Sequence, residues 1–284
     1  MFGQTPSGRG GMASMPADSR RLRPALWQTG RLWRRAEMKL AGKKALVTGA
    51  SRGIGRGIAL AFAAEGADVA VGYRREKHAA EETVQAIQAK GRRGFAYAAD
   101  VRDAAAVRAM VHSAHADLGG LDIVVANAGV PTRFQPLHEV EPSYWQRVLE
   151  IDLHGVFHTV HAALPLLRAQ QSGVILTISS VAADICGANG GPYVAAKAGV
   201  NALTKVIARE NAALNVRCNV IAPGLIKTDI ADGMLEFHGD DLVKSIPLQR
   251  MGTPEECAQL AVYLASDDAS WITGKVFRID GGAW

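Results

Sequence analysis

The residues Thr48-Gly-Ala-Ser-Arg-Gly-Ile-Gly55 join a short apolar run, Ala45–Thr48, to a segment of helical periodicity, Ile58–Ala64. Glycine has no β-carbon, so a glycine-rich turn here lets the backbone approach a phosphate closely. The following helix would then present its N–H groups and positive dipole end to that phosphate. A glycine motif alone is weak evidence, but one between a strand and a helix predicts a dinucleotide-binding turn. The predicted contacts are Gly49, Ser51, Arg52, Gly53, Ile54 and Gly55.

After the turn, short apolar runs alternate with longer segments of helical periodicity, such as Glu81–Lys90 and Ala104–Ala116. The runs are almost continuous in apolar residues, as expected for parallel strands that helices cover on both faces. We therefore predict an α/β fold with a Rossmann-type, doubly wound parallel sheet, whose ligands bind beyond the carboxyl ends of the strands. The predicted strands are Ala45–Thr48, Val69–Tyr73, Gly94–Ala98, Ile123–Ala126, Val174–Ile178, Arg217–Ile221 and Lys275–Ile279.

The end of the second predicted strand, Gly72-Tyr-Arg-Arg75, indicates which cofactor binds. An acidic residue that accepts from a ribose 2′-hydroxyl is expected about 20 residues after the glycine turn, and this stretch has none. Arg74 and Arg75, with Arg52 of the turn, could instead bind a 2′-phosphate. Arginines that only solvate a loop are the alternative. We predict NADP(H) as the cofactor, with Tyr73 beside the two arginines.

Further residues follow the third, fourth and sixth predicted strands, where the same cofactor should lie. An aspartate could accept from the adenine amine, small residues and an asparagine amide could lie beside the ribose, and a threonine could bind the carboxamide. Each residue also has an ordinary explanation as part of a turn, so their recurrence at successive strand ends carries the prediction. These residues are Asp100, Val101, Asn127, Ala128, Gly129, Pro223, Gly224 and Thr228.

Tyr193 and Lys197 lie four residues apart in Gly190-Gly-Pro-Tyr-Val-Ala-Ala-Lys197, and Ser180 precedes the tyrosine by thirteen positions. On a helix, side chains at this spacing share a face, so the ammonium would lie close to the phenol. The positive charge could lower the pKa of the tyrosine from about 10 toward the working range of proton exchange. The spacing alone is common on amphipathic helices, so its meaning depends on the loops around it.

These motifs together resemble the short-chain dehydrogenase/reductase family over residues 38–284. The resemblance rests on the glycine turn, Asp100, Asn127-Ala-Gly129, Ser180, Tyr193-x-x-x-Lys197, Pro223-Gly224 and the terminal Asp280-Gly-Gly282. It implies a seven-stranded sheet, a homotetramer and chemistry that needs no metal ion. Within the family, Lys39–Gly55 is most similar to 3-oxoacyl-carrier-protein reductases, with sugar or polyol dehydrogenases as the second candidates.

The family resemblance also implies a mechanism. Ser180 would hydrogen-bond the carbonyl of a small or carrier-bound substrate, Tyr193 would donate a proton to its oxygen, and hydride would come from the nicotinamide. Lys197 would lower the pKa of the tyrosine and hold the nicotinamide ribose. We therefore expect an NADP(H)-dependent oxidoreductase. The alternative is a catalytically weak NADP-binding regulatory protein, although such a protein has no physical reason to retain all three residues.

One residue departs from the family pattern. Ile151-Asp-Leu-His-Gly155 places Asp152 where the family usually has an asparagine that helps to hold a water linked to the lysine. An aspartate keeps the acceptor oxygens, loses the amide donor and brings negative charge toward Lys197. It could raise the pKa of Tyr193, accept a proton in the relay, or simply be tolerated. We include Asp152 among the predicted catalytic residues.

Charge divides the chain into two parts. The net charge of +5 is carried by residues 1–37, and the remaining residues balance to zero. Nucleic-acid binding by a basic face therefore has no support beyond residue 37. We expect residues 1–37 to be a disordered basic extension, with a targeting segment or a phosphate-binding arm as alternatives. Residues 38–284 are expected to form one dinucleotide-binding catalytic domain.

Apolar runs and cysteines bear on where the protein works. No apolar run approaches the roughly 18 residues of a membrane-spanning helix, so no membrane partner is expected. The three cysteines, Cys186, Cys218 and Cys257, have neither a metal-binding nor a redox-pair spacing. We therefore predict a soluble protein of a reducing compartment, the cytoplasm.

The substrate pocket is expected to draw on Val130–Phe134, Ala182–Gly191 and Leu225–Met251, with the last segment forming a mobile lid. Their mixture of apolar and small residues does not identify a substrate. Apolar positions on the helices that follow Asp152 and carry Tyr193 fit either a tetramer interface or core packing. These positions are Val156, Val160, Ala163, Leu166, Val200, Leu203 and Ile207.

Overall fold

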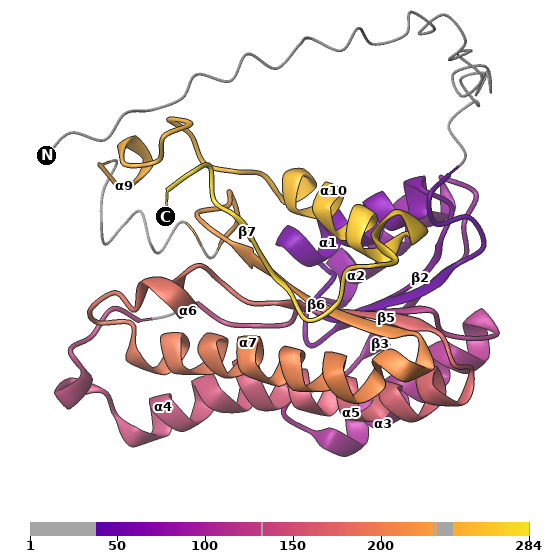
Figure 1. The fold of residues 1–284 in the computed structure, drawn as a ribbon, viewed down its shortest axis with the longest axis horizontal. Coiled ribbons are helices and arrows are strands. Elements are labelled where there is room, and N and C mark those ends of the chain that lie inside the picture. The colour runs from indigo at the N-terminus through magenta and orange to yellow at the C-terminus, as the bar shows by residue number, and fades with distance from the viewer. Residues whose placement is uncertain (1–37, 132, 230, 232–240, 284) are drawn as a thin grey trace, which may run out of the picture. The chain divides into compact units, whose positions relative to one another are not determined.

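Seven strands form one parallel sheet in the part of the chain that the structure describes (Figure 1). This computed structural model describes residues 38–131, 133–229, 231 and 241–283. The order across the sheet is β3-β2-β1-β4-β5-β6-β7, and every neighbouring pair is parallel. The strands are β1 (Lys44–Val47), β2 (Asp68–Tyr73), β3 (Gly94–Ala98), β4 (Ile123–Ala126), β5 (Gly173–Ile178), β6 (Val216–Pro223) and β7 (Val276–Ile279). The predicted fold class is confirmed.

Helices cover both faces of the sheet, as Figure 1 shows. On one face pack α1 (Gly53–Ala64), α2 (Lys77–Gln88) and α10 (Pro254–Ala265), and on the other α3 (Ala104–Leu118), α5 (Gly155–Ala169) and α7 (Gly191–Asn211). The helix α4 (Pro142–Leu149) continues through a π-helical turn, Glu150–His154, into α5. The shorter elements are α6 (Ala182–Ile185), α9 (Asp241–Lys244) and the 3₁₀ helices Leu137–Glu139, Ala212–Leu214 and Asp267–Ala269.

Local sequence signals set where several helices begin and end. The Thr253 side chain accepts from the backbone N–H of Glu256, whose carboxylate accepts from the backbone N–H of Thr253, and this capping box starts α10. Asp103 caps α3 with its carboxylate, which accepts from the backbone N–H groups of Ala105 and Ala106. Gly119 ends α3 with a φ of 72°, a left-handed conformation that glycine adopts without strain. These caps fix the start of α10 and both ends of α3.

The core explains why the strand runs are so apolar. Every residue of β4 and β5 is buried, because helices lie on both sides of these central strands. The sequence left open whether the apolar positions of α5 and α7 form a tetramer interface or pack in the core. In the structure these positions belong to the core. Val156, Val160, Ala163, Val200 and Ile207 are buried in it, and Leu166 and Leu203 pack against it partly buried. Core packing is therefore their role in the monomer.

The strand order reverses beside β1, which pairs with β2 on one side and with β4 on the other. Helices diverge at such a point, so a crevice opens beyond the carboxyl ends of the strands. Observed strand ends differ from the predicted ones by at most two residues, since β6 extends to Pro223 through its pairing with Ile279. The predicted extension, residues 1–37, and residues 230 and 232–240 of the predicted lid lie outside the described residues.

Candidate active site

The glycine turn between β1 and α1 forms one wall of a cavity at this crevice. Gly49 and Gly53 have φ angles of 63° and 56°, in the left-handed region that favours glycine. A β-carbon on Gly49 would lie 2.9 Å from the Cα of Ala128, and one on Gly55 would overlap the side-chain nitrogen of Asn127. The turn therefore requires glycine, and it brings bare backbone to the cavity in the way that phosphate recognition needs.

Asn127 holds this turn in place. Its side-chain Nδ2 donates to the carbonyl oxygens of Thr48 at 2.9 Å and Gly49 at 3.2 Å. The backbone N–H groups of Asn127 and Ala128 donate to Thr48 Oγ1 at 3.0 and 3.1 Å. The amide predicted to lie beside the ribose is thus already bonded to the protein, and it connects the end of β4 to the glycine turn.

One cavity of about 770 Å³ collects the predicted residues from successive strand ends. Every predicted site residue lines it except Gly55, whose role is to allow the close packing of the turn. The structure therefore brings together residues that are scattered from Gly49 to Thr228 in the sequence. In the described part of the chain, no group of His, Cys, Asp and Glu side chains is arranged to hold a metal ion.

The arginines predicted to select the cofactor lie on the rim of this cavity. Arg74 and Arg75 follow β2 and are exposed. Arg52 donates through Nη1 to Oδ2 of Asp229 at 2.8 Å, and both side chains are about two-thirds exposed. The pair connects the glycine turn with the segment that follows β6. The sequence does not predict this pair, because Arg52 and Asp229 are 177 positions apart.

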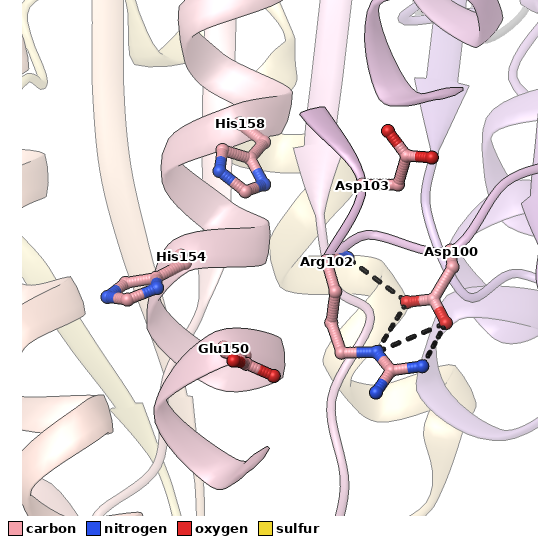
Figure 2. A pocket seen from close by; sticks show the side chains of 6 residues that line it. All are labelled: Asp100, Arg102, Asp103, Glu150, His154 and His158. Carbon is pink, nitrogen blue, oxygen red and sulfur yellow. Dashed lines mark hydrogen bonds and ion pairs between the residues drawn. The ribbon is translucent and has the colours of Figure 1, made fainter. Parts of the chain in front are cut away.

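Asp100, which follows β3, is held by Arg102 (Figure 2). Arg102 Nη2 lies 2.7 Å from Oδ2, while its Nε and backbone N–H donate to Oδ1 at 3.0 and 3.1 Å. The hydrogen bond from the guanidinium is the largest cause that lowers the pKa of Asp100 to about 2. The carboxylate thus stays ionised, and a bond to an adenine amine would use its remaining lone pairs. In the sequence, only the two-residue spacing between Asp100 and Arg102 indicates this ion pair.

A second, more open cavity of about 490 Å³ lies on the other side of this ion pair. Figure 2 shows three side chains of the π-helical turn and α5 opposite Asp100 and Arg102. One of them, His158, has its Nδ1 2.9 Å from the carbonyl oxygen of Val101. Because a carbonyl only accepts, Nδ1 carries the proton. The cavity is lined by Asp100, Arg102, Asp103, Glu150, His154 and His158.

Ser180, Tyr193 and Lys197 meet in the larger cavity. Ser180 follows β5, and the other two residues lie one turn apart on α7. Lys197 Nζ lies 5.4 Å from the centroid of the Tyr193 ring. Ser180 Oγ accepts from the backbone N–H of Ala182 at 3.1 Å, and its hydrogen bond to Tyr193 acts to lower the pKa of the phenol. The predicted trio is thus assembled beside the glycine turn.

The Lys197 ammonium is buried between two acceptors. Nζ donates to the carbonyl oxygen of Ile178 at 3.1 Å and lies 3.1 Å from Oδ1 of Asp152. Asp152 is fully buried in the π-helical turn and accepts from the backbone N–H of Val130 at 3.3 Å. A β-carbon on Gly129 would lie 2.6 Å from Oδ1 of Asp152. The space for this carboxylate therefore depends on a glycine at the end of β4.

The predicted lowering of the Tyr193 pKa is wrong in this structure. Burial raises the pKa of the phenol, Lys197 lowers it, Asp152 raises it again, and the net shift is upward. Burial acts to lower the pKa of Lys197, but Asp152 and Tyr193 raise it and the net shift is also upward. Burial raises the pKa of Asp152 against the effect of Lys197. The lowering was predicted from the ammonium, and a raising effect of the Asp152 carboxylate was one of the alternatives, but desolvation, the largest cause, was left out.

The substrate side of the cavity is mostly apolar in the residues that the structure describes. Thr228 Oγ1 donates to the carbonyl oxygen of Ile226 at 3.2 Å. A β-carbon on Gly224 would lie 2.9 Å from the Cα of Asp280, so the loop after β6 packs closely against the segment after β7. Beyond Tyr193, the lining residues include Phe134, Val181, Ala182, Ile185, Ala188, Asn189, Val194, Leu225, Ile226, Ala231 and Leu242.

Comparisons of the sequence with known proteins agree on one family. A family profile described as Enoyl-(Acyl carrier protein) reductase matches residues 49–283. A 3-oxoacyl-(acyl-carrier-protein) reductase of Staphylococcus aureus is 42% identical over 242 residues, which cover 85% of this chain and 98% of the relative. A cis-4-hydroxycyclohexanecarboxylate dehydrogenase of Sinomonas cyclohexanicum is 38% identical over 242 residues, which cover 85% of this chain and 96% of that protein.

A solved structure extends the agreement to three dimensions. The crystal structure of a short-chain type dehydrogenase/reductase from Mycobacterium marinum superposes with a TM-score of 0.82 at 37% sequence identity, and the match covers 87% of this chain and 97% of that one. The chain therefore belongs to the short-chain dehydrogenase/reductase family.

Proposed function

We propose that this oxidoreductase is an NADP(H)-dependent carbonyl reductase that acts on 3-oxoacyl thioesters held on an acyl carrier. The observation that carries the proposal is the meeting of Tyr193 and Lys197 with the glycine turn in one cavity. The 42% identity to a 3-oxoacyl-(acyl-carrier-protein) reductase supports the substrate class. Arg74 and Arg75, the first two residues after β2, lie exposed at the rim and support binding of a 2′-phosphate, and Glu76 follows them in the same lining.

The residues present fit a nicotinamide dinucleotide. A β-carbon on Gly49 or Gly55 would collide with neighbouring atoms, so the turn has only bare backbone at these positions. The cavity beside this turn lies at the point where the strand order reverses, which is where dinucleotides bind in such sheets. The glycine turn would hold the pyrophosphate, Asp100 and Val101 the adenine, and Pro223, Gly224 and Thr228 the nicotinamide. The cofactor supplies or accepts the hydride when it is bound there.

The protein's own contribution is to position the carbonyl and to move a proton. Ser180 Oγ orients the substrate oxygen, and the Tyr193 phenol donates its proton to that oxygen during reduction. An ammonium group has three protons, and the contacts to Asp152 and Ile178 engage two of those of Lys197. The third is available to the ribose hydroxyls, which would align cofactor and substrate.

The apolar substrate side favours a hydrophobic carbonyl compound. In the described residues, the charged side chains that line the cavity, apart from Asp152 and Lys197, come from the strand ends of the cofactor half and from Asp229. A sugar or polyol would need more hydrogen-bonding partners around its hydroxyls than this lining offers. An alicyclic alcohol or ketone is the second candidate, supported by the 38% identity to a cis-4-hydroxycyclohexanecarboxylate dehydrogenase.

The family resemblance further supports a cytoplasmic homotetramer. Among the described residues, no helix is both long and apolar enough to cross a membrane. The exposed large apolar residues of α5 and α7 are Phe157 and Val206. In a tetramer, these side chains would be among those available to a neighbouring subunit.

A substrate panel tests the proposal. NADPH and NADH consumption is measured with β-keto thioesters, alicyclic ketones, diketones and quinones, and NADP reduction is measured with sugars and cyclic alcohols. We expect the highest kcat/KM for a β-keto thioester with NADPH. A preference for an alicyclic substrate would select the second candidate. Cofactor binding without turnover on any compound would instead indicate a regulatory protein.

Replacement of Tyr193 by phenylalanine tests the proton donor. We expect Tyr193→Phe to reduce kcat by at least about 100-fold, as is typical when a general acid is removed, while NADPH still binds in a fluorescence titration. Tyr97→Phe is the matched control, because Tyr97 hydrogen-bonds Asp117 at the surface and does not line the cavity. Near-normal turnover by the Tyr193 variant would exclude the phenol as the acid.

A further inference from the structure

The position of Asp152 places a carboxylate, rather than an uncharged amide, against the ammonium of Lys197. The two groups are 3.1 Å apart, and their side chains are 0% and 4% exposed. Water cannot screen this contact, so the electrostatic effect of each charge on its surroundings is larger than it would be at the surface. The carboxylate consequently affects every group that the ammonium affects, with the opposite sign.

Three contacts fix Asp152 where it lies. Its oxygens accept from the backbone N–H of Val130 at 3.3 Å, Lys197 lies against Oδ1, and Gly129 leaves room for the same oxygen. In the π-helical turn that carries Asp152, Asp152 and Ile151 are buried. The other two titratable side chains of this turn, Glu150 and His154, line the separate cavity of Figure 2. Asp152 is thus the one acidic side chain of this turn that contacts Lys197.

We propose that Asp152 is a positioning residue: its carboxylate fixes the Lys197 ammonium beside Ile178 and offsets its charge, so that Tyr193 remains a proton donor at alkaline pH. The inference rests on the proposed function, because it concerns the same proton. Among the described residues, the groups that act on the phenol are Lys197, which lies 5.4 Å from the ring centroid, Asp152 through its charge, and Ser180 through a hydrogen bond. Lys197 and Ser180 favour phenolate, and Asp152 opposes them.

The sign of the effect follows from this arrangement. A carboxylate next to the ammonium turns an isolated positive charge into a nearly neutral pair, whose field at the phenol is weaker. The phenol therefore keeps its proton to a higher pH than it would beside the lysine alone. During reduction this extends the pH range in which Tyr193 can donate. During oxidation the phenolate must accept a proton. The carboxylate therefore moves the acid limb of the pH–activity profile to higher pH by the same amount.

The test is a phenolate titration by ultraviolet absorbance, with Asp152→Asn as the variant. The chain has five tyrosines, so each protein is compared with its own Tyr193→Phe counterpart and the difference reports Tyr193 alone. We expect the midpoint for Tyr193 to fall by about one pKa unit or more in Asp152→Asn, as one charge at a few ångströms in a partly screened site can produce. An unchanged or higher midpoint would overturn the proposal.

Glu150→Gln is the matched control, because it removes the same charge from the same turn on the side that faces away from the site. We expect its Tyr193 midpoint to equal that of the parent protein. Asp152→Ser, a smaller uncharged replacement, gives a second variant if the asparagine protein does not fold, which circular dichroism would reveal. It should shift the midpoint in the same direction, and no shift would count against the proposal.

Kinetics give a readout that a purely structural role would not move. The acid limb of kcat/KM for alcohol oxidation should shift to lower pH in Asp152→Asn by the amount seen in the titration. Complete loss of activity with an unshifted titration would show that the carboxylate is needed as a proton acceptor, which overturns the inference. The titration needs no turnover, so a midpoint that shifts in Asp152→Asn while the parent protein turns over no compound of the substrate panel would refute the proposed function and leave the inference standing.

Discussion

Two ion pairs connect elements of the same cavity, and they differ mainly in exposure. Lys197 and Asp152 are 3.1 Å apart with side chains that are 4% and 0% exposed. Arg52 and Asp229 are closer, at 2.8 Å, but their side chains are 66% and 67% exposed. Exposed pairs contribute about 0 to 1 kcal/mol because water and salt screen them. Removing one partner of a buried pair costs about 3 to 5 kcal/mol, because the other charge is left without a partner.

The comparison shows that burial, rather than distance, decides what each pair can do. The buried pair is a permanent part of the site, since neither group can exchange its partner for water. The exposed pair can open at little cost, so Arg52 is available to another anion. A permanent charge arrangement suits the proton donor, and an exchangeable one suits a cofactor that must enter and leave.

The largest expected effect comes from breaking the buried pair. Asp152→Ala should lower the free energy of unfolding by about 3 to 5 kcal/mol, because Lys197 would then be buried without a counter-charge. Urea unfolding followed by circular dichroism measures the loss. The double variant Asp152→Ala with Lys197→Met should recover much of it, since an uncharged pair leaves no unpaired charge. A loss below about 1 kcal/mol would mean that the pair behaves like an exposed one.

The sequence predicted the framework of this site more fully than its electrostatics. Strand runs such as Ile123–Ala126 were correct because continuous apolar residues report burial on both faces. Gly49 was correctly read as a turn residue, because a left-handed φ and close contact leave few alternatives. These features depend on residues that are near one another in the chain.

Features that depend on distant partners escaped prediction. The Tyr193 pKa was placed in the wrong direction, because burial of the phenol follows from how loops pack over α7 and no local pattern encodes it. Asn127 lines the cavity, but the bonds from its amide to Thr48 and Gly49, residues of another strand end, were not predicted. The partner of Arg52, Asp229, became visible only when β6 was placed in the sheet.

A smaller effect is expected from opening the exposed pair. Asp229→Asn should release Arg52 and tighten NADPH binding by up to about fivefold, the equivalent of the roughly 1 kcal/mol that such a pair can contribute. NADH affinity should change less, because NADH lacks the 2′-phosphate. Fluorescence titrations with both cofactors measure this difference.

The control for this variant is Asp268→Asn. Asp268 pairs with Lys39 at 2.7 Å, and the side chains are 58% and 46% exposed, but neither residue lines the cavity. Its removal should leave both cofactor affinities unchanged. Equal tightening of NADPH and NADH by Asp229→Asn would show that Arg52 does not distinguish the 2′-phosphate, and no change in either would show that the pair does not restrict Arg52.

A third pair, of intermediate exposure, makes a contribution to stability that changes only where the pH is acidic enough to protonate its carboxylate. Asp100 and Arg102 are 2.7 Å apart, with side chains that are 27% and 41% exposed. Hydrogen bonds from Arg102 lower the pKa of Asp100 from 3.8 to about 2. Because the folded-state pKa lies below the unfolded one, this pair stabilises the fold above the unfolded pKa. The contribution is lost as the pH falls from about 4 to about 2.

Comparison with Asp100→Asn isolates that contribution. The difference in unfolding free energy between the parent and the variant should be constant near neutral pH, and it should shrink as acid protonates the carboxylate. Urea unfolding at a series of pH values measures it, and added salt should reduce the difference at neutral pH because the pair is partly exposed. A difference that stays constant into the acid range would mean that the Asp100 pKa is not lowered. The salt sensitivity of the Asp100–Arg102 pair should lie between that of the buried Lys197–Asp152 pair and that of the exposed Arg52–Asp229 pair, because its exposure lies between theirs.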